Sequence, residues 1–179
     1  MLRVGYPRIS KSLEYRGPLF HTMNFANEWK DEVSEDAEAK SFWDDFFNVF
    51  GISSKRVSTF EHRVKKLDDK DGYIDLLWKV TILIEMKSRG KNLDKAYQQA
   101  KDYTHGLKQH ELPKYILISD FENFRLHDLE ETKNIAFKLH DLVNNVQHFG
   151  YLLGYQKKVY KEQRAPLNQM ALVCHALKW

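Results

Sequence analysis

Two apolar segments separated by only two residues constrain the fold of this 179-residue chain most strongly. Residues 73–78 (YIDLLW) and 81–87 (TILIEMK) are rich in β-branched and aromatic side chains, which is typical of strands. Only Lys79 and Val80 lie between them, so the pattern predicts a tight antiparallel hairpin. The fold has to place this apolar hairpin in its interior.

Helical and strand-like segments alternate around the hairpin. After Ser34, a plausible N-cap followed by acidic residues, aromatic side chains recur at spacings of three and four and predict an amphipathic helix over 35–50. A second helix is predicted from Leu93 to near Gly106. Strands are predicted over 56–66, 115–118, 124–129 and, at an edge, 134–139, and a last helix over 141–153. This order predicts an α/β fold with a central mixed sheet flanked by helices.

The two ends of the chain lack this regular pattern. Residues 1–24 contain isolated glycines and prolines without a clear period, and we interpret them as an irregular arm. The predicted domain then spans residues 25–153. Residues 154–179 are interpreted as a basic helical tail or linker, because basic side chains are followed by an apolar stripe with no evident partner.

Composition excludes several classes of protein. No apolar run approaches the roughly 20 residues that span a bilayer, so we expect no membrane partner. The first 20 residues lack the apolar core of a secretory signal, and a single cysteine, Cys174, excludes a disulfide framework. We therefore expect a cytoplasmic protein. The net charge of +3 permits nucleic-acid binding without requiring it.

Three charged side chains are expected to meet at one end of the hairpin. If the turn centres on residue 80, Asp75 lies opposite Glu85 with their Cβ atoms about 5 Å apart, and Lys87 shares the face of Glu85. Two carboxylates this close favour a bound cation, and hard oxygen ligands suit Mg²⁺. The lysine would offset negative charge that develops on a phosphate. These residues are suited to metal-assisted hydrolysis of phosphodiesters.

A plainer interpretation of the same residues stays open. In a chain with 30% charged residues, a Glu-x-Lys sequence arises about once by chance, and such a pair usually lies on a solvated strand edge. The apolar run 82–84 directly before Glu85 favours a buried position, where a charge without a role is costly.

The sequence around these charges is similar to a known family. Asp75, Glu85 and Lys87 resemble the signature of PD-(D/E)XK nucleases in type and spacing. The longer segments 85–103 and 115–129 resemble the amino-terminal nuclease domain of MmeI-like type IIL restriction–modification enzymes. The similarity extends over about residues 25–163.

The resemblance implies a restriction-endonuclease-like fold and Mg²⁺-dependent cleavage of double-stranded DNA, with Mn²⁺ as a substitute. Asp75 and Glu85 would be metal ligands, and Lys87 would position or activate water. Gln99 would support catalysis, because with Tyr103 it matches the Gln-x-x-x-Tyr element that abuts the active site in several such nucleases.

Further residues follow from the resemblance. A glutamate of the first helix often completes the metal site, and Glu35 matches best, with Glu38 second. Glu35 is equally well explained as a residue that stabilises the helix N-terminus. We expect Arg89, Lys91 and Tyr103 to contact DNA.

The chain also departs from the family. Val80 stands in the hairpin turn, where we expect glycine in relatives. Relatives continue into a helical spacer, a methyltransferase and a target-recognition domain, and isolated prolines exclude the Asn-Pro-Pro-aromatic methyltransferase motif here. We therefore expect a truncated or split member, with a methyltransferase or target-recognition partner in cis or in trans and a homodimer on DNA. Two alternatives remain: a catalytically silent DNA-binding or assembly module of the same fold, and a nuclease for RNA or structured nucleic acid.

Overall fold

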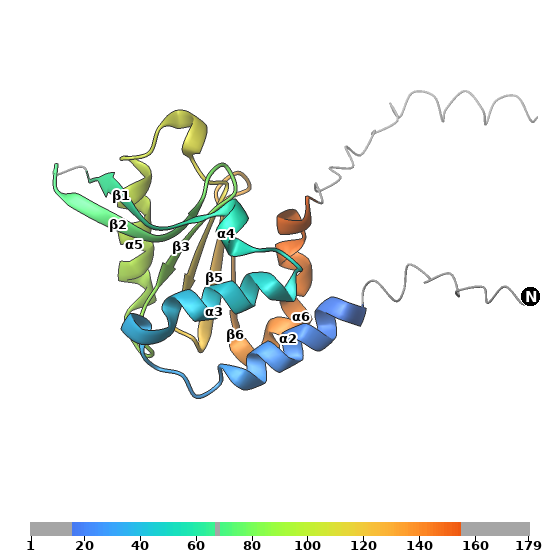
Figure 1. The fold of residues 1–179 in the computed structure, drawn as a ribbon. Helices are drawn as coiled ribbons and strands as arrows, with labels where there is room; N and C mark the ends of the chain where they lie inside the picture. Colours follow the sequence, from blue (N-terminus) through green and yellow to red (C-terminus); the bar gives the residue numbers. More distant parts are fainter. Residues whose placement is uncertain (1–15, 67–68, 155–179) are drawn as a thin grey trace, which may run out of the picture.

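The domain is built on one six-stranded mixed sheet (Figure 1). The structure, a computed structural model, describes residues 16–66 and 69–154. The strands lie in the order of the sequence: β1 (Thr59–Lys65), β2 (Asp71–Trp78), β3 (Ile82–Met86), β4 (Tyr115–Ser119), β5 (Asn123–Asp128) and β6 (Lys133–Lys138). Only β3 and β4 are parallel, because a helix crosses over between them, and the other neighbours are antiparallel. The predicted α/β class with a mixed sheet and flanking helices is confirmed.

Helices cover both faces of the sheet (Figure 1). They are α2 (Arg16–Glu28), α3 (Glu35–Val49), α4 (Ser54–Val57), α5 (Leu93–Thr104) and α6 (Leu142–Asn145), with 3₁₀ helices η1 (Gln109–Glu111), η2 (Leu139–Asp141) and η3 (Val146–Leu153). α2, α3 and η3 pack on one face, and α5 packs on the other against β2, β3 and β4. No helix within the described ranges is long and apolar enough to cross a membrane.

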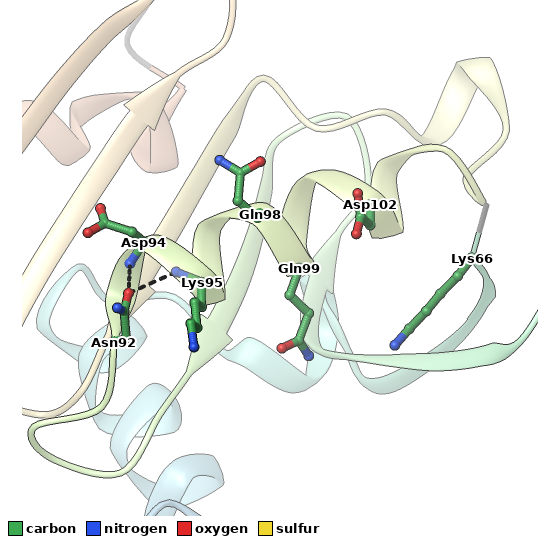
Figure 2. A pocket seen from close by; sticks show the side chains of 7 residues that line it. All are labelled: Lys66, Asn92, Asp94, Lys95, Gln98, Gln99 and Asp102. Atoms are coloured by element: carbon green, nitrogen blue, oxygen red, sulfur yellow. Dashed lines mark hydrogen bonds between the residues drawn. The ribbon is translucent and has the colours of Figure 1, made fainter. Parts of the chain in front are cut away.

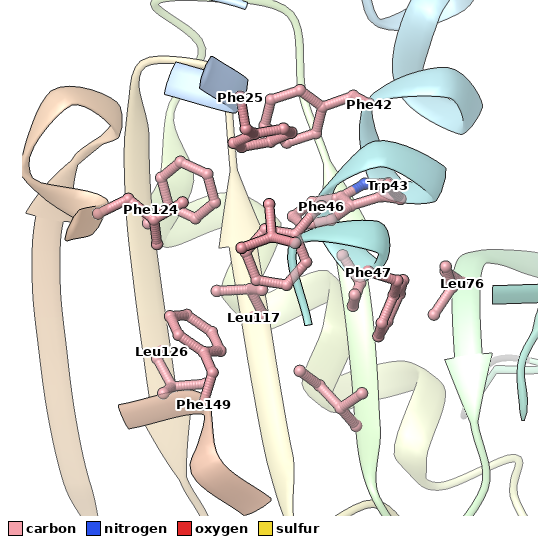
Figure 3. Close-up of a cluster of buried hydrophobic side chains, with 14 of the residues drawn as sticks. Phe25, Phe42, Trp43, Phe46, Phe47, Leu76, Leu117, Phe124, Leu126 and Phe149 are labelled. Carbon is pink, nitrogen blue, oxygen red and sulfur yellow. The ribbon is translucent and has the colours of Figure 1, made fainter. Parts of the chain in front are cut away.

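The core beneath α3 is mainly aromatic (Figure 3). Phe42 and Phe46, one helical turn apart, are fully buried. Their rings meet Phe25 of α2 and Phe149 of η3, with centroids 5.0 Å apart for Phe25 and Phe42 and 5.2 Å apart for Phe46 and Phe149. Aromatic pairs at such separations add to the stability gained by burial. The aromatic periodicity that predicted α3 therefore also fixes how it packs.

The core cluster between α5 and the sheet is smaller and mainly aliphatic. Ala96 and Ala100 of α5 are buried against Leu83 and Ile118 of the sheet. Asn92 caps the start of the helix, and its side-chain oxygen accepts hydrogen bonds from the backbone N–H groups of residues 94 and 95 at 2.9 and 3.0 Å. This cap fixes the start of α5 directly after the loop that follows β3.

The hairpin of β2 and β3 has the predicted register. Leu76 lies opposite Ile84 and Leu77 opposite Leu83, so Asp75 and Glu85 occupy the next facing positions. Val80 in the turn has φ of 65°, a left-handed conformation that favours glycine. The strand pairing persists although a β-branched residue stands where glycine would fit without strain.

Several predicted boundaries are wrong. The prediction places the end of the irregular arm at residue 24, but α2 begins at Arg16. Pro18 does not prevent this, because a proline is tolerated in the first turn of a helix. The expected last helix is divided into α6 and η3, and Gly154 ends it with φ of 77°. A short helix, α4, replaces the first residues of the strand expected over 56–66. The predicted tail after Gly154 lies outside the described residues.

Candidate functional site

The hairpin brings Asp75, Glu85 and Lys87 to one place. Glu85 is the fourth residue of β3, and Lys87 follows the strand directly. The Lys87 ammonium lies 2.9 Å from Glu85 Oε1. Asp75 Oδ2 accepts a hydrogen bond of 2.6 Å from the backbone N–H of Met86, which holds its carboxylate at the same end of the hairpin. The convergence expected from the strand register is therefore present.

Burial makes the two carboxylates costly to ionise. Glu85 is 1% exposed. Burial raises its pKa to about 8, and the charge of Asp75 contributes in the same direction. Burial also raises the pKa of Asp75 to about 6, although the hydrogen bond from Met86 opposes the rise. This end of the hairpin therefore stabilises a positive charge placed between the two acids.

Lys87 supplies part of that positive charge. Burial alone would lower its pKa, but the neighbouring carboxylates of Glu85 and Asp75 raise it above its ordinary value. The side chain is consequently a protonated ammonium at neutral pH. In this state it donates hydrogen bonds and does not accept a proton.

Glu35 joins the site from the first turn of α3. Its Oε1 lies 3.5 Å from the Lys87 ammonium, and its Oε2 accepts a hydrogen bond of 2.9 Å from the backbone N–H of Ser88. These contacts join residues more than 50 positions apart in the sequence. Glu38 makes no ion pair with Lys87. Of the two glutamates considered from the sequence, Glu35 is the one that reaches the site.

Gln99 connects α5 to Glu85. Its side-chain Nε2 donates hydrogen bonds to Glu85 Oε1 at 2.7 Å and to the hydroxyl of Tyr103 at 2.6 Å. Tyr103 is 3% exposed and packs close to Gly72 of β2. Tyr103 therefore orients Gln99, which in turn holds the carboxylate. Direct contact of Tyr103 with DNA remains a prediction, and its burial disfavours it.

The loop after β3 carries the two other residues expected to contact DNA. The Arg89 guanidinium donates a hydrogen bond of 2.7 Å to the carbonyl oxygen of Lys30, and so ties the loop to the segment before α3. Lys91 is exposed and lines a groove of about 590 Å³ beside β5 and β6. Of the two, Lys91 is the side chain open to a ligand.

Asp120 is a site-supporting residue that the sequence analysis missed. It follows β4, is 2% exposed and accepts a hydrogen bond of 3.1 Å from the backbone N–H of Gly90. The backbone N–H of Lys87 donates to the carbonyl oxygen of Ser119 at 2.8 Å. The end of β4 thus holds the loop that carries Lys87. An acidic residue two positions after the apolar run 115–118 was the available signal, much as an acid directly after 82–84 was for Glu85.

The side chains present fit a divalent cation in part. Glu85 Oε2 is buried and has no hydrogen-bond partner, so one carboxylate oxygen is left for a ligand of opposite charge. Asp75 and Glu85 could hold a hard cation, with Glu35 nearby. Within the described ranges, no three His, Cys, Asp or Glu side chains form a ready metal-binding cluster. The ammonium of Lys87 lies between the carboxylates of Glu85 and Glu35.

Comparison with known proteins identifies the family. The model of the family described as "MmeI, N-terminal domain" matches residues 21–171. The chain belongs to this family. The resemblance found in the sequence around the hairpin and α5 is therefore confirmed, and the match extends on both sides of the range over which the sequence resembles the family.

Other comparisons are more distant. A structure described as "cryoEM structure DrdV-DNA complex" is 14% identical, with a TM-score of 0.49. The similarity covers 75% of this MmeI N-terminal domain chain and 13% of that chain, so the chain spans a small part of that protein's length. No curated protein matches this chain significantly.

Proposed function

We propose that this chain is the metal-dependent DNA endonuclease module of a restriction–modification system, with a PD-(D/E)XK active site. One observation carries the proposal: the buried Glu85 shares one oxygen with Lys87 and Gln99, leaves the other without a partner, and faces Asp75 across the hairpin. Membership of the MmeI N-terminal domain family supports it. A carboxylate in this setting is expensive to keep unless it serves a ligand.

The proposed mechanism gives each side chain a defined task. Asp75 and Glu85 would hold Mg²⁺, or Mn²⁺ in its place, and Glu35 would complete the ligand set. The bound ion would supply Lewis-acid activation of water and neutralise phosphate charge. Lys87, as an ammonium, donates hydrogen bonds to the attacking water or to a phosphate oxygen and offsets charge that develops there. Gln99 keeps the Glu85 carboxylate in a fixed orientation.

Plasmid cleavage tests this function. The purified chain is expected to nick or degrade plasmid DNA with Mg²⁺ and to be inert with EDTA. Lys87→Ala is expected to abolish cleavage while the circular dichroism spectrum stays unchanged. Lys133→Ala is the matched control, because Lys133 is exposed on the edge strand β6. Equal cleavage by the wild type and Lys87→Ala would show that the nuclease is a contaminant and would overturn the proposal.

A second candidate is a silent module that binds DNA or assembles with a partner. The position of the Lys87 ammonium between two carboxylates favours it, because an internal cation already neutralises part of the site. This candidate predicts DNA binding without cleavage at any Mg²⁺ or Mn²⁺ concentration.

Partners of the proposed nuclease follow from its chemistry. A module with one active site cuts one strand at a time, and two copies would cut both strands in one encounter, so we propose dimerisation on DNA. A methyltransferase with a target-recognition domain, in cis or in trans, would supply sequence specificity.

A further inference from the structure

The side of α5 that faces the candidate site is basic. Lys95 and Gln99 are one helical turn apart, and both extend to the same side of the helix as Lys66, which follows β1 (Figure 2). Asp94 and Gln98 extend to the other side (Figure 2). A groove of about 530 Å³ runs along these residues, and Asp94, Gln98 and Asp102 also line it. Lys95 and Lys66 nevertheless lie on the side of Gln99, while Asp94 extends away from them (Figure 2).

No acid in the described part of the chain neutralises the charges of these two lysines. Among the described residues, no carboxylate lies within ion-pair distance of the ammonium of Lys66 or Lys95. Lys66 lies over the ring of Tyr103, with its ammonium 5.3 Å from the ring centroid. In the neighbouring groove, by contrast, Arg125 pairs with Asp94. An anionic ligand near α5 therefore meets its available positive charge on the side of Gln99.

The geometry relates these two charges to the candidate site. Gln99 lines the groove between Lys95 and Lys66, and its amide reaches Glu85. Residues four apart in a helix are separated by about 6 Å along its axis, which is within the reach of a lysine side chain. A strand lying in the groove would thus pass Lys95, Gln99 and Lys66 in turn, with its middle beside the buried carboxylate.

We propose that Lys66 and Lys95 bind two backbone phosphates of duplex DNA, one on each side of the phosphodiester presented to Glu85 and Lys87. The inference rests on the proposed nuclease function and deepens it, because it assigns a path to the substrate strand. An ammonium recognises phosphate as a point charge, so these contacts position the strand without reading its sequence. Lys66 and Lys95 are therefore binding residues, and their loss weakens substrate binding without altering the chemistry.

Equilibrium binding of a duplex oligonucleotide tests the inference. The measurements use the full chain carrying Glu85→Gln, so that cleavage does not interfere. Adding Lys66→Gln or Lys95→Gln is expected to weaken binding about tenfold each, as the loss of one charge-assisted contact would. The slope of log affinity against log salt is expected to become shallower by about 0.9 for each lost phosphate contact.

Matched variants separate this effect from a general loss of charge. Lys101→Gln removes the same charge from α5, but Lys101 lies over the ring of Tyr97, outside the groove. It is expected to leave the salt slope unchanged. Lys66→Arg and Lys95→Arg, which keep the charge, are expected to restore binding. Melting temperatures equal to that of the parent chain would establish that the variants are folded.

The outcomes distinguish this inference from the proposed function. If the wild type cleaves plasmid but the Lys66 and Lys95 variants bind like Lys101→Gln, the phosphate path is overturned and the nuclease stands. If the lysine variants lose affinity while no metal-dependent cleavage occurs, the path stands and the catalytic proposal fails. If the chain binds no duplex at all, both fail.

Discussion

The variant Glu85→Gln is expected to stabilise the metal-free protein. Glu85 is 1% exposed, and burial is the main reason that its pKa is raised from 4.5 to about 8. The unfolded chain keeps the ordinary pKa, so folding of the wild type above pH 4.5 carries a penalty that a neutral amide of similar shape avoids. The amide also keeps a side-chain oxygen beside the Lys87 ammonium.

The penalty has a definite dependence on pH. Below pH 4.5 the carboxyl group is protonated in both states, so wild type and variant differ little. As the pH rises from 4.5 to about 8, the unfolded state loses its proton first and the stability of the wild type falls relative to the variant. One pKa unit corresponds to about 1.4 kcal/mol, so the full penalty at pH 9 is on the order of 5 kcal/mol.

Denaturant unfolding at pH 5, 7 and 9 in EDTA measures this difference. The advantage of Glu85→Gln is expected to grow with pH, whereas Glu130→Gln, at an exposed ion pair with Lys114, is expected to change stability by less than about 1 kcal/mol at any pH. Excess Mg²⁺ is expected to stabilise the wild type and not Glu85→Gln. A stability difference that is independent of pH, or a less stable variant at pH 9, would show that the buried Glu85 carboxylate carries no such penalty.

Three further substitutions, one of them with a control, test packing and backbone strain by the same measurement. Gly72→Ala would place a Cβ atom 2.5 Å from Cε1 of Tyr103 and is expected to cost about 1–3 kcal/mol; unchanged stability would mean that the ring is not fixed. Val80→Gly relieves a φ of 65° and is expected to stabilise by up to about 1 kcal/mol, and a less stable variant would contradict the strain. Phe46→Ala, at a fully buried ring, is expected to cost about 3–5 kcal/mol, whereas Phe20→Ala, at a residue 64% exposed, is expected to cost little, so equal costs would contradict the assigned core.

The sequence predicted the central hairpin because strand alternation and a short turn determine register together. Leu83 faces α5, and its neighbours Ile82 and Ile84 face α3, as a period of two requires. Once that register is known, the facing positions of Asp75 and Glu85 follow from it. This part of the site needed no tertiary information.

The remaining parts of the site depend on contacts between distant segments. The resemblance placed Glu35 ahead of Glu38, but only the packing of α3 against the sheet brings Glu35 to Ser88. The burial of Tyr103 was implicit in the apolar stripe that predicted α5, and the expectation of a DNA contact overlooked it. The local sequence marks Asp120 as an acid beside an apolar strand, but its contact with the backbone of Gly90, 30 residues away, depends on the fold.

Anomalous scattering from crystals grown with Mn²⁺ would locate the ion that Asp75 and Glu85 are proposed to hold. We expect one Mn²⁺ peak within coordination distance of a carboxylate oxygen of Asp75 and of Glu85 Oε2, and no such peak in Glu85→Gln crystals. A wild-type structure with saturating Mn²⁺ and no peak between these two carboxylates would contradict the proposed metal site.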